Sequence, residues 1–262
     1  MNATRMPRHY RTVWLSDIHL GCRSSQPDKL LAFLNSMECD TLYLVGDIID
    51  GWKFGRGWRW SEIQTEIVQD FLRRAQQGTR VVLMPGNHDP MFRNFAGLAF
   101  CGLEIKNEVV HETADGRRLW VVHGDAHDGL GHHARWLSRL ADVTYQATVS
   151  LNRVIAAART RMGKPYWCLP NYVKTHFPKS VRFIYRFEET VSAAAARRGY
   201  DGVVCGHIHL PAIKTLNGVQ YCNDGDWVES CTALVEQTDG RLELIEAGAA
   251  ATAVQPRFVL AS

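Results

Sequence analysis

Five short apolar runs, rich in β-branched and aromatic residues, constrain the fold of this chain most strongly. Their length and composition are typical of buried strands. Segments with helical spacing separate several of them, and alternating strands and helices indicate a layered α/β fold. The runs are RTVWL (11–15), TLYLV (41–45), RVVLM (80–84), RLWVV (118–122) and GVVC (202–205).

Two of the separating segments carry clear helix signals. In residues 61–77, Ser61 and Gln64 form a capping box, apolar residues recur every four positions, and Gly78 follows. The second segment, residues 188–198, begins with acidic residues and ends with basic ones before a glycine, as the helix dipole favours. Both segments are predicted to be helices.

Residues 212–245 return to short strand-like runs, separated by Asn-Gly and Asp-Gly pairs that are typical of hairpins. We expect these runs to complete a second sheet. Residues 127–187 differ, because they show helical spacing of aromatic and aliphatic residues and no strand pattern. They predict a helical insertion, or lid, within a single domain of residues 1–262.

The predicted insertion is strongly basic. Residues 127–187 contain ten Lys or Arg and two acidic residues, so the segment has a net charge of +8 and the rest of the chain −5, for +3 overall. Two interpretations follow: a solvated face, or a cap that binds an anionic partner such as a substrate phosphate or an acidic lipid surface. The candidate substrate-binding residues are Arg153, Arg159, Arg161 and Lys164.

Composition narrows the class of protein. No apolar stretch approaches the roughly 18 residues that span a bilayer, and the basic N-terminus lacks the apolar core of a secretory signal. The seven cysteines are scattered without a CxxC pair, which predicts reduced thiols. We therefore expect a cytoplasmic location. No feature predicts sequence-specific nucleic-acid binding or a particular oligomeric state.

Each of the five apolar runs ends in a cluster of potential metal ligands. Because ligands bind at the carboxyl ends of strands in α/β sheets, we expect the clusters to converge. Asp17 with His19, and His207 with His209, are separated by two positions, which in an extended chain directs both side chains to one face. Nearby glycines permit close backbone approach. The clusters are DIH (17–19), GDIID (46–50), GNHD (86–89), HGD (123–125) and GHIH (206–209).

The chemistry of these clusters predicts a dinuclear metal site. Carboxylate, imidazole and amide oxygen together suit Mn²⁺, Fe²⁺ or Zn²⁺, and Mn²⁺ is our first choice. The set is too large for one ion and suits two divalent cations bridged by a carboxylate, for which Asp47 is the candidate. The seven candidate ligands are Asp17, His19, Asp47, Asn87, His123, His207 and His209.

In this order, the clusters resemble those of the calcineurin-like metallophosphoesterase superfamily, whose pattern is D-x-H, G-D-x-x-D, G-N-H-[DE], H and G-H-x-H. The similarity covers residues 13–210. It implies a four-layer αββα sandwich and hydrolysis of a phosphoester or pyrophosphate bond at two metal ions. It also implies one ligand set of Asp17, His19, Asp47 and His209, and a second of Asp47, Asn87, His123 and His207.

The same resemblance implies that His88 lies beside the phosphate, where it would stabilise the transition state or protonate the leaving oxygen, with Asp89 orienting it. Asp125 and Asp128 follow the fourth cluster closely. They are candidates for substrate contact or ligand orientation, with a helix N-cap as the alternative. Three tryptophans between residues 52 and 60 either line the site or pack elsewhere.

More narrowly, D-I-H-L-G, the basic insertion and G-H-I-H resemble the UDP-2,3-diacylglucosamine pyrophosphatase family of lipid A synthesis and its paralogues. That resemblance implies a nucleotide-linked glycolipid substrate and peripheral contact with the inner face of the cytoplasmic membrane. The family carries Arg where this chain has His88, and residues 223–230 look more like the paralogous branch. A phosphodiesterase or phosphomonoesterase acting on a soluble nucleotide or other phosphoester is the alternative. A metal-bearing interaction module without catalysis is the second alternative.

Overall fold

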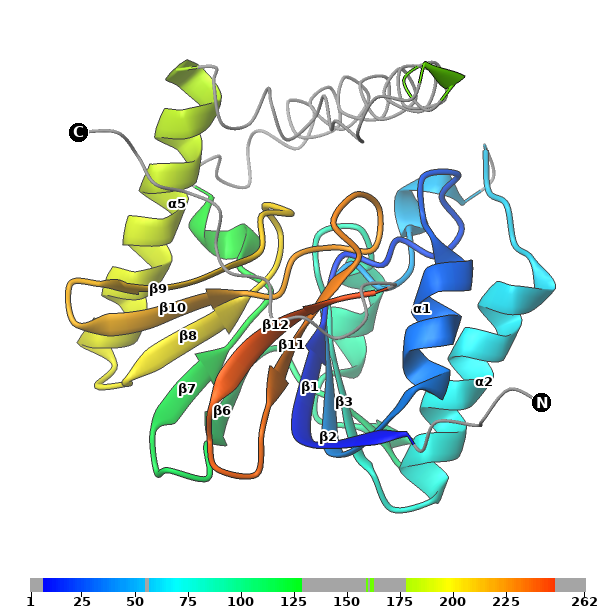
Figure 1. Cartoon of the computed structure of the whole chain (residues 1–262), viewed down its shortest axis with the longest axis horizontal. Coiled ribbons are helices and arrows are strands. Elements are labelled where there is room, and N and C mark those ends of the chain that lie inside the picture. The colour runs from blue at the N-terminus through cyan, green and yellow to red at the C-terminus, as the bar shows by residue number, and fades with distance from the viewer. Residues whose placement is uncertain (1–6, 55–56, 129–158, 160, 163–177, 248–262) are drawn as a thin grey trace. The chain divides into compact units, whose positions relative to one another are not determined.

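The computed structural model describes residues 7–54, 57–128, 159, 161–162 and 178–247. The chain divides into two compact units, one of residues 1–124 with 192–262 and one of residues 125–191. Both sheets and all the predicted metal ligands belong to the first unit (Figure 1).

Seven strands form the first sheet in the order β12-β11-β1-β2-β3-β5-β4. Strands β1, β2, β3 and β5 are parallel, whereas β11, next to β1, and β4, at the edge beside β5, run antiparallel to their neighbours. The strands are β1 (Arg8–Leu15), β2 (Met37–Val45), β3 (Arg80–Met84), β4 (Ala99–Phe100), β5 (Leu103–Ile105), β11 (Thr232–Glu236) and β12 (Leu242–Glu246).

Five strands form the second sheet in the order β6-β7-β8-β10-β9, with β7, β8 and β10 parallel. The C-terminal strands were expected to complete one sheet, but they divide between two. A hairpin around Asn217 and Gly218 joins β9 to β10, whereas β11 and β12 extend the first sheet beside β1. The strands are β6 (Val109–Glu112), β7 (Arg118–Val121), β8 (Gly202–Cys205), β9 (Ala212–Leu216) and β10 (Val219–Asn223).

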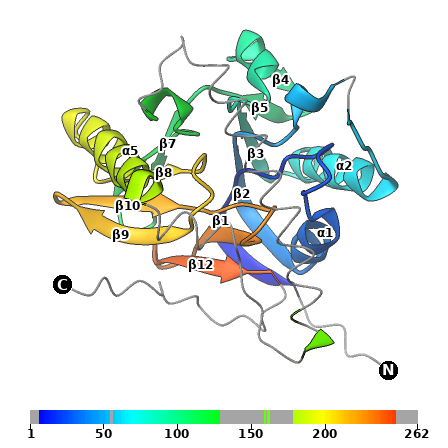
Figure 2. The same ribbon diagram turned by 90° about the horizontal axis from the view of Figure 1, so that it is seen from above.

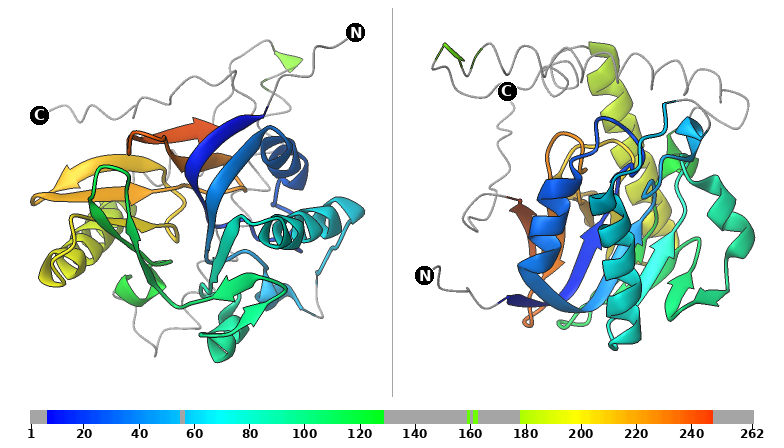
Figure 3. Two further views of the ribbon diagram at one scale, coloured as in Figure 1. Left: turned by 90° about the horizontal axis from the view of Figure 1, so that it is seen from below. Right: turned by 90° about the vertical axis from the view of Figure 1, so that its right-hand side faces the viewer.

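The two faces of the first sheet bury different partners. Val13 and Leu15 of β1 pack in one apolar cluster with Leu30 and Phe71 of the helices α1 (Pro27–Asn35) and α2 (Glu62–Gln76). Alternate residues of the strand point the other way, so Trp14 joins side chains of the second sheet in a separate cluster. The sheets therefore pack face to face, with α1 and α2 on the outer face of the first sheet, as Figures 2 and 3 show.

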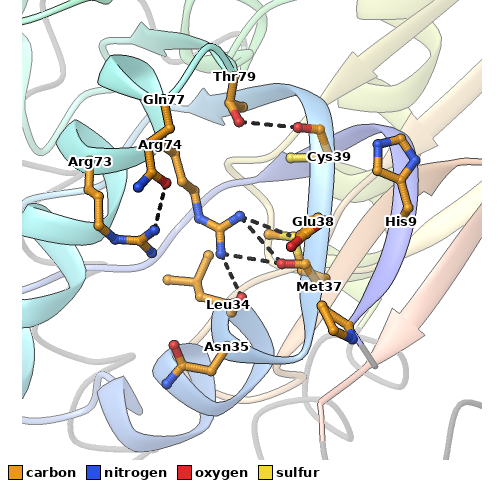
Figure 4. A pocket seen from close by; sticks show the side chains of 11 residues that line it. His9, Leu34, Asn35, Met37, Glu38, Cys39, Arg73, Arg74, Gln77 and Thr79 are labelled. Atoms are coloured by element: carbon orange, nitrogen blue, oxygen red, sulfur yellow. Dashed lines mark hydrogen bonds between the residues drawn. The ribbon is translucent and has the colours of Figure 1, made fainter. Parts of the chain in front are cut away.

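Helix α2 confirms the predicted capping box. The Ser61 hydroxyl accepts from the Gln64 backbone N–H, and the Gln64 side chain accepts from the Ser61 N–H. At its other end, buried Arg74 donates to the backbone oxygens of Leu34 and Met37 and ties α2 to the end of α1 and the start of β2 (Figure 4). None of the predicted site residues lines the hollow of about 360 Å³ beside Arg74.

Helix α5 (Pro178–Arg197) begins ten residues earlier than its acidic pair predicted. Glu188 lies in the middle of the helix and is buried, and Pro178, whose fixed φ suits the first helical position, begins it instead. The predicted end is confirmed, because Gly199 follows at φ 74°. The residue before it, Arg198, lies over the Trp120 ring of the second sheet at 4.2 Å.

Most of the predicted basic insertion lies outside the described residues. Three short 3-10 helices complete the described part: η1 (Gly51–Lys53), η2 (Pro90–Phe95) and η3 (Asp125–His127). Within the described residues, every helix is too short or too polar to cross a bilayer.

Candidate metal centre

The five ligand clusters follow the carboxyl ends of β1, β2 and β3 in one sheet and of β7 and β8 in the other. These strands are parallel within each sheet, and contacts of His123 with Val45 and of His209 with Asp17 bring the carboxyl ends of both sheets together, as the sequence predicted. Three overlapping groups bring ligand atoms within 4.8 Å of one another: Asp17 with His19 and His209, His19 with Asp47 and His88, and Asp17 with Asp47 and His123.

Five of the seven predicted ligands have their backbone in the left-handed region that residues other than glycine rarely adopt. Such conformations cluster at functional sites, where the surrounding fold imposes them. The sequence argument assumed extended backbone for the paired ligands, and the structure corrects it: left-handed turns, not strand alternation, direct these side chains. The φ angles are 50° at Asp17, 52° at His19, 55° at Asp47, 69° at His207 and 50° at His209.

Two glycines make room for the ligands. Gly46 has a φ of 85°, and a Cβ atom added there would clash with the ring of His123. A Cβ at Gly86 would clash with the carboxylate and backbone nitrogen of Asp47. Close backbone approach at these positions therefore requires glycine, as predicted.

The side chains of Asp17, His19 and His209 converge on one another. The Oδ1 atom of Asp17 is buried and has no hydrogen-bond partner among the described residues, although it lies 3.0 Å from Nε2 of His209 and 3.8 Å from Nε2 of His19. The two imidazole Nε2 atoms are 3.4 Å apart. Because unpaired buried polar atoms are destabilising, their convergence fits a shared cation.

Asp47 lies at the centre of the cluster. Its Oδ1 atom accepts the backbone N–H of His88 at 2.7 Å. Its Oδ2 atom faces three imidazole nitrogens, the Nε2 atoms of His123, His19 and His88, at 3.5, 3.9 and 4.0 Å. One carboxylate oxygen surrounded in this way suits a group that bridges two ions.

The remaining predicted ligands surround His123. Its Nδ1–H donates to the backbone oxygen of Val45 at 2.8 Å, and its Nε2 atom faces Asp47 at 3.5 Å. That Nε2 atom lies 3.3 Å from Oδ1 of Asn87. The ring of His207 stands edge-on to the His123 ring, with centroids 5.3 Å apart. The structure thus brings all seven predicted ligands together.

The electrostatics of the cluster favour cations. Burial opposes ionisation of Asp17 and Asp47, but the neighbouring imidazoles outweigh it and hold the pKa of both carboxyls well below the ordinary range. Burial also opposes protonation of His19, yet Asp17 and Asp47 raise its pKa to about 10. A buried cluster that attracts protons so strongly also attracts divalent cations, which compete with those protons.

His88 is held from two sides. Its Nδ1 lies 3.1 Å from Oδ1 of Asp50, and its ring stacks on Trp52 with centroids 3.8 Å apart. Burial opposes ionisation of Asp50, but the hydrogen bond from His88 lowers the pKa of that carboxyl. Asp50, rather than the expected Asp89, makes the hydrogen bond that orients His88.

Asp89 instead organises backbone. Its carboxylate accepts N–H groups of Gly86 at 2.6 Å and Ile48 at 2.8 Å, and so links the second and third clusters. Burial and the charge of Asp47 raise the pKa of Asp89 to about 6. Its contribution to the site is to fix two ligand-bearing turns.

Sequence reasoning missed two polar residues behind the ligands. Ser16 is buried, and its hydroxyl lies 2.6 Å from both Asp17 Oδ2 and Asp224 Oδ1. Asp224, in the segment that follows β10, is also fully buried. The only sequence signal was the Asn-Asp-Gly-Asp run at 223–226, which suggested a hairpin turn.

The predicted substrate-binding residues belong to the second unit. Asp125 begins η3 and is half-buried, as is Asp128 just after it. Arg159 is half-buried and Arg161 is exposed, whereas Arg153 and Lys164 lie outside the described residues. Their contact with substrate stays a prediction.

Several known proteins are similar to this chain. UDP-2,3-diacylglucosamine hydrolase of Chromohalobacter salexigens is 26% identical over 82% of this chain and 88% of its own length. The enzyme of the same name from Shewanella sp. strain MR-7 is 27% identical over 88% of this chain and 95% of its own. A phosphoesterase of known structure from E. coli covers 93% of this chain and 96% of its own, with 13% identity and a TM-score of 0.47.

The family assignment rests on a longer match. The calcineurin-like phosphoesterase family model matches residues 10–211, a span that contains all five ligand clusters. The fold agrees with that assignment, since two sheets flanked by helices place the clusters at one edge. The chain belongs to the calcineurin-like phosphoesterase family.

Proposed function

We propose that the protein hydrolyses a pyrophosphate or phosphoester bond with two divalent cations. Asp17, His19, Asp47 and His209 would hold one cation, and Asp47, Asn87, His123 and His207 the other. The observation that carries the proposal is the position of Asp47 Oδ2, within 4.0 Å of three imidazole nitrogens. We propose Mn²⁺ as the native ion, with Fe²⁺ or Zn²⁺ as alternatives, because the donor set mixes nitrogen with oxygen.

The proposed reaction depends on the two cations and on His88. When bound, the two cations would supply the positive charge that activates water near neutral pH and offsets the charge of the phosphoryl oxygens. His88 donates its Nδ1–H to Asp50, so its Nε2 atom faces the site. From there, a protonated Nε2 stabilises the transition state or supplies a proton to the leaving oxygen. Trp52 stacks on the His88 ring, and Asp89 accepts the Gly86 N–H in the turn that carries His88, so both keep this imidazole in place.

We propose UDP-2,3-diacylglucosamine as the substrate, cleaved at its pyrophosphate. Support comes from the relatives that carry that substrate in their names and match most of this chain. On this proposal, Asp125, Asp128 and the basic residues of the insertion contact the anionic substrate. A lipid-linked substrate would also bring the protein to the inner face of the membrane.

One observation favours the alternative of a soluble phosphoester. His88 stands where the pyrophosphatase family carries arginine, and a titratable imidazole held by Asp50 differs from a fixed guanidinium in both charge and proton transfer. An enzyme that protonates its leaving group suits phosphodiesters with poor leaving groups.

A substrate panel separates the two. The Mn²⁺-loaded protein is incubated with UDP-2,3-diacylglucosamine, bis(p-nitrophenyl) phosphate and cyclic nucleotides, with Asp47→Asn as the matched control. We expect UMP release from the lipid substrate at a rate well above that of any soluble phosphoester. Hydrolysis of soluble diesters without UMP release would select the alternative. A fully loaded protein that cleaves no member of the panel would contradict the hydrolase assignment.

A further inference from the structure

The segment of residues 223–230, at the end of β10, forms hydrogen bonds to the backbone of the first ligand cluster. The backbone N–H of Trp227 donates to the backbone oxygen of Asp17 at 3.1 Å. The side-chain amide of Asn223 donates to the oxygen of Gly206 at 2.7 Å, next to the last ligand cluster. Asn223, Asp224 and Trp227 are completely buried. This segment therefore contacts the first and the last ligand clusters without contributing a predicted ligand.

The hydrogen bonds of Asp17 determine which of its oxygens is available. Its Oδ2 atom accepts from the Ser16 hydroxyl at 2.6 Å and from the His207 N–H at 2.8 Å. Its Oδ1 atom is the buried oxygen that lies 3.0 Å from Nε2 of His209. Two donors on Oδ2 thus direct Oδ1 toward the other ligands.

The number of protons available to Ser16, Asp17 and Asp224 determines the protonation state of Asp224. The Ser16 hydroxyl lies 2.6 Å from Asp17 Oδ2 and 2.6 Å from Asp224 Oδ1, but it has a single proton to donate. One of the two short contacts must therefore be donated to the hydroxyl. Asp17 Oδ2 also accepts the His207 N–H, as an acceptor-only carboxylate does, so we assign the second proton to Asp224. The buried Oδ2 atom of Asp224 has no partner among the described residues, which also suits a neutral carboxyl.

We propose that Asp224 is a positioning residue of the metal centre. It donates a hydrogen bond to Ser16, so that the Ser16 proton is directed to Oδ2 of Asp17 and Oδ1 is presented to the cation. Burial and the charge of Asp17 raise the pKa of Asp224 well above the ordinary value, in agreement with the proton count. The inference rests on the metal centre proposed above, but not on the identity of the substrate.

The test compares Asp224→Asn with Asp224→Ala and Ser16→Ala in the full chain, by calorimetric titration of the metal-free protein with Mn²⁺. An asparagine amide can still donate to Ser16, so Asp224→Asn should keep its affinity within about threefold of the wild type. Asp224→Ala and Ser16→Ala should weaken binding by about 10–100-fold, the range for outer-shell groups of metal sites. Ser36→Ala is the matched control and should keep wild-type affinity, because its hydroxyl donates to the Phe33 backbone oxygen at the end of α1, away from the ligands.

The outcomes are distinct. Loss of affinity in Asp224→Asn equal to that in Asp224→Ala would show that charge, not donation, matters, and would overturn the inference. Wild-type affinity in Asp224→Ala or Ser16→Ala would overturn it as well. Thermal unfolding of each metal-free variant establishes that it is folded, and if Asp224→Ala is not, Ser16→Ala and Asp224→Asn decide. A wild-type chain that binds neither Mn²⁺ nor Zn²⁺ would overturn the metal centre together with this inference.

Discussion

Two buried clusters in the first unit combine imidazole with carboxylate, and their hydrogen bonding differs sharply. In the Glu236 cluster (Arg11, Thr12, His111 and Glu236), the fully buried carboxylate accepts from Arg11 at 2.7 Å, Thr12 at 2.8 Å and His111 at 2.9 Å. In the metal centre, by contrast, Asp17 Oδ1 and His19 Nδ1 are buried without a hydrogen-bond partner among the described residues.

The backbone shows the same contrast. Residues of the Glu236 cluster lie in regular strands, whereas five of the predicted ligands have positive φ angles. A buried polar cluster that satisfies itself stabilises the fold, and one that leaves converging atoms unsatisfied on strained backbone is built for a ligand. The comparison teaches that residue type alone does not identify a site, whereas several converging ligand atoms with unmet hydrogen bonds on left-handed backbone indicate one.

The largest effect is expected at the centre of the metal site. Asp47→Asn removes the charge that three imidazole nitrogens face, and we expect hydrolysis of bis(p-nitrophenyl) phosphate to fall by at least about 10³-fold. Stopped-time assays at saturating Mn²⁺ measure it. Because the neighbouring imidazoles stabilise the ionised Asp47 carboxylate, the metal-free variant should also unfold at a lower temperature than the metal-free wild type. Activity within tenfold of the wild type would refute the bridging role.

The two histidine–carboxylate pairs can be compared directly. His88→Ala should reduce kcat by roughly 10²–10³-fold, as expected for loss of an acid catalyst, while leaving Mn²⁺ stoichiometry intact. His111→Ala should leave kcat unchanged and lower the free energy of unfolding, because His111 donates to Glu236. Steady-state kinetics and urea unfolding of both variants make the comparison. A catalytic loss in His111→Ala larger than in His88→Ala would reverse the assignment.

The Glu236 cluster should influence stability alone. Glu236→Gln leaves Arg11 and His111 without their counter-charge, and we expect a loss of about 3 kcal/mol in the free energy of unfolding, near the lower end for broken buried pairs because Arg11 is partly exposed. Glu243→Gln on β12, whose partner Arg241 is exposed, is the matched control and should change stability by less than about 0.5 kcal/mol. Calorimetric Mn²⁺ affinity should be the same in all three proteins.

The smallest effect is a pH dependence of that stability. Burial opposes ionisation of Glu236, but His111, the Ala114 N–H, Thr12 and Arg11 outweigh it and lower its pKa to about 2. A depressed carboxyl pKa stabilises the fold above the ordinary value of 4.5, and that contribution is lost as pH falls from there toward about 2. Urea unfolding should therefore show a wild-type advantage over Glu236→Gln that is constant near neutrality and shrinks below pH 4.5. An advantage that persists undiminished at pH 2.5 would contradict this account.

Much of the fold follows from local sequence. The five buried runs, the capping box of α2 and the turn at Asn217 and Gly218 are specified by residues close in the chain. The start of α5 could not be predicted from local sequence, because the acidic pair at Glu188 has the composition typical of a first helical turn. Strands β4, β5 and β6 have four residues or fewer, too short for a period to appear, and no local signal tells which sheet β11 joins.

The candidate site divides in the same way. The convergence of the predicted ligands could be predicted because each lies just after the carboxyl end of a strand. The left-handed backbone at Asp17 and the link from Asp224 through Ser16 could not, because both depend on segments about 200 residues apart meeting in the fold. Likewise, Asp50 and Asp89 could not be assigned their separate hydrogen bonds from spacing alone.

The central claim is that the ligand clusters hold two cations bridged by Asp47. Anomalous diffraction from crystals grown with Mn²⁺ tests it most directly. The account predicts two peaks about 3.5–4 Å apart, with an Asp47 oxygen between them. A single peak, or two peaks that do not share Asp47, would contradict it.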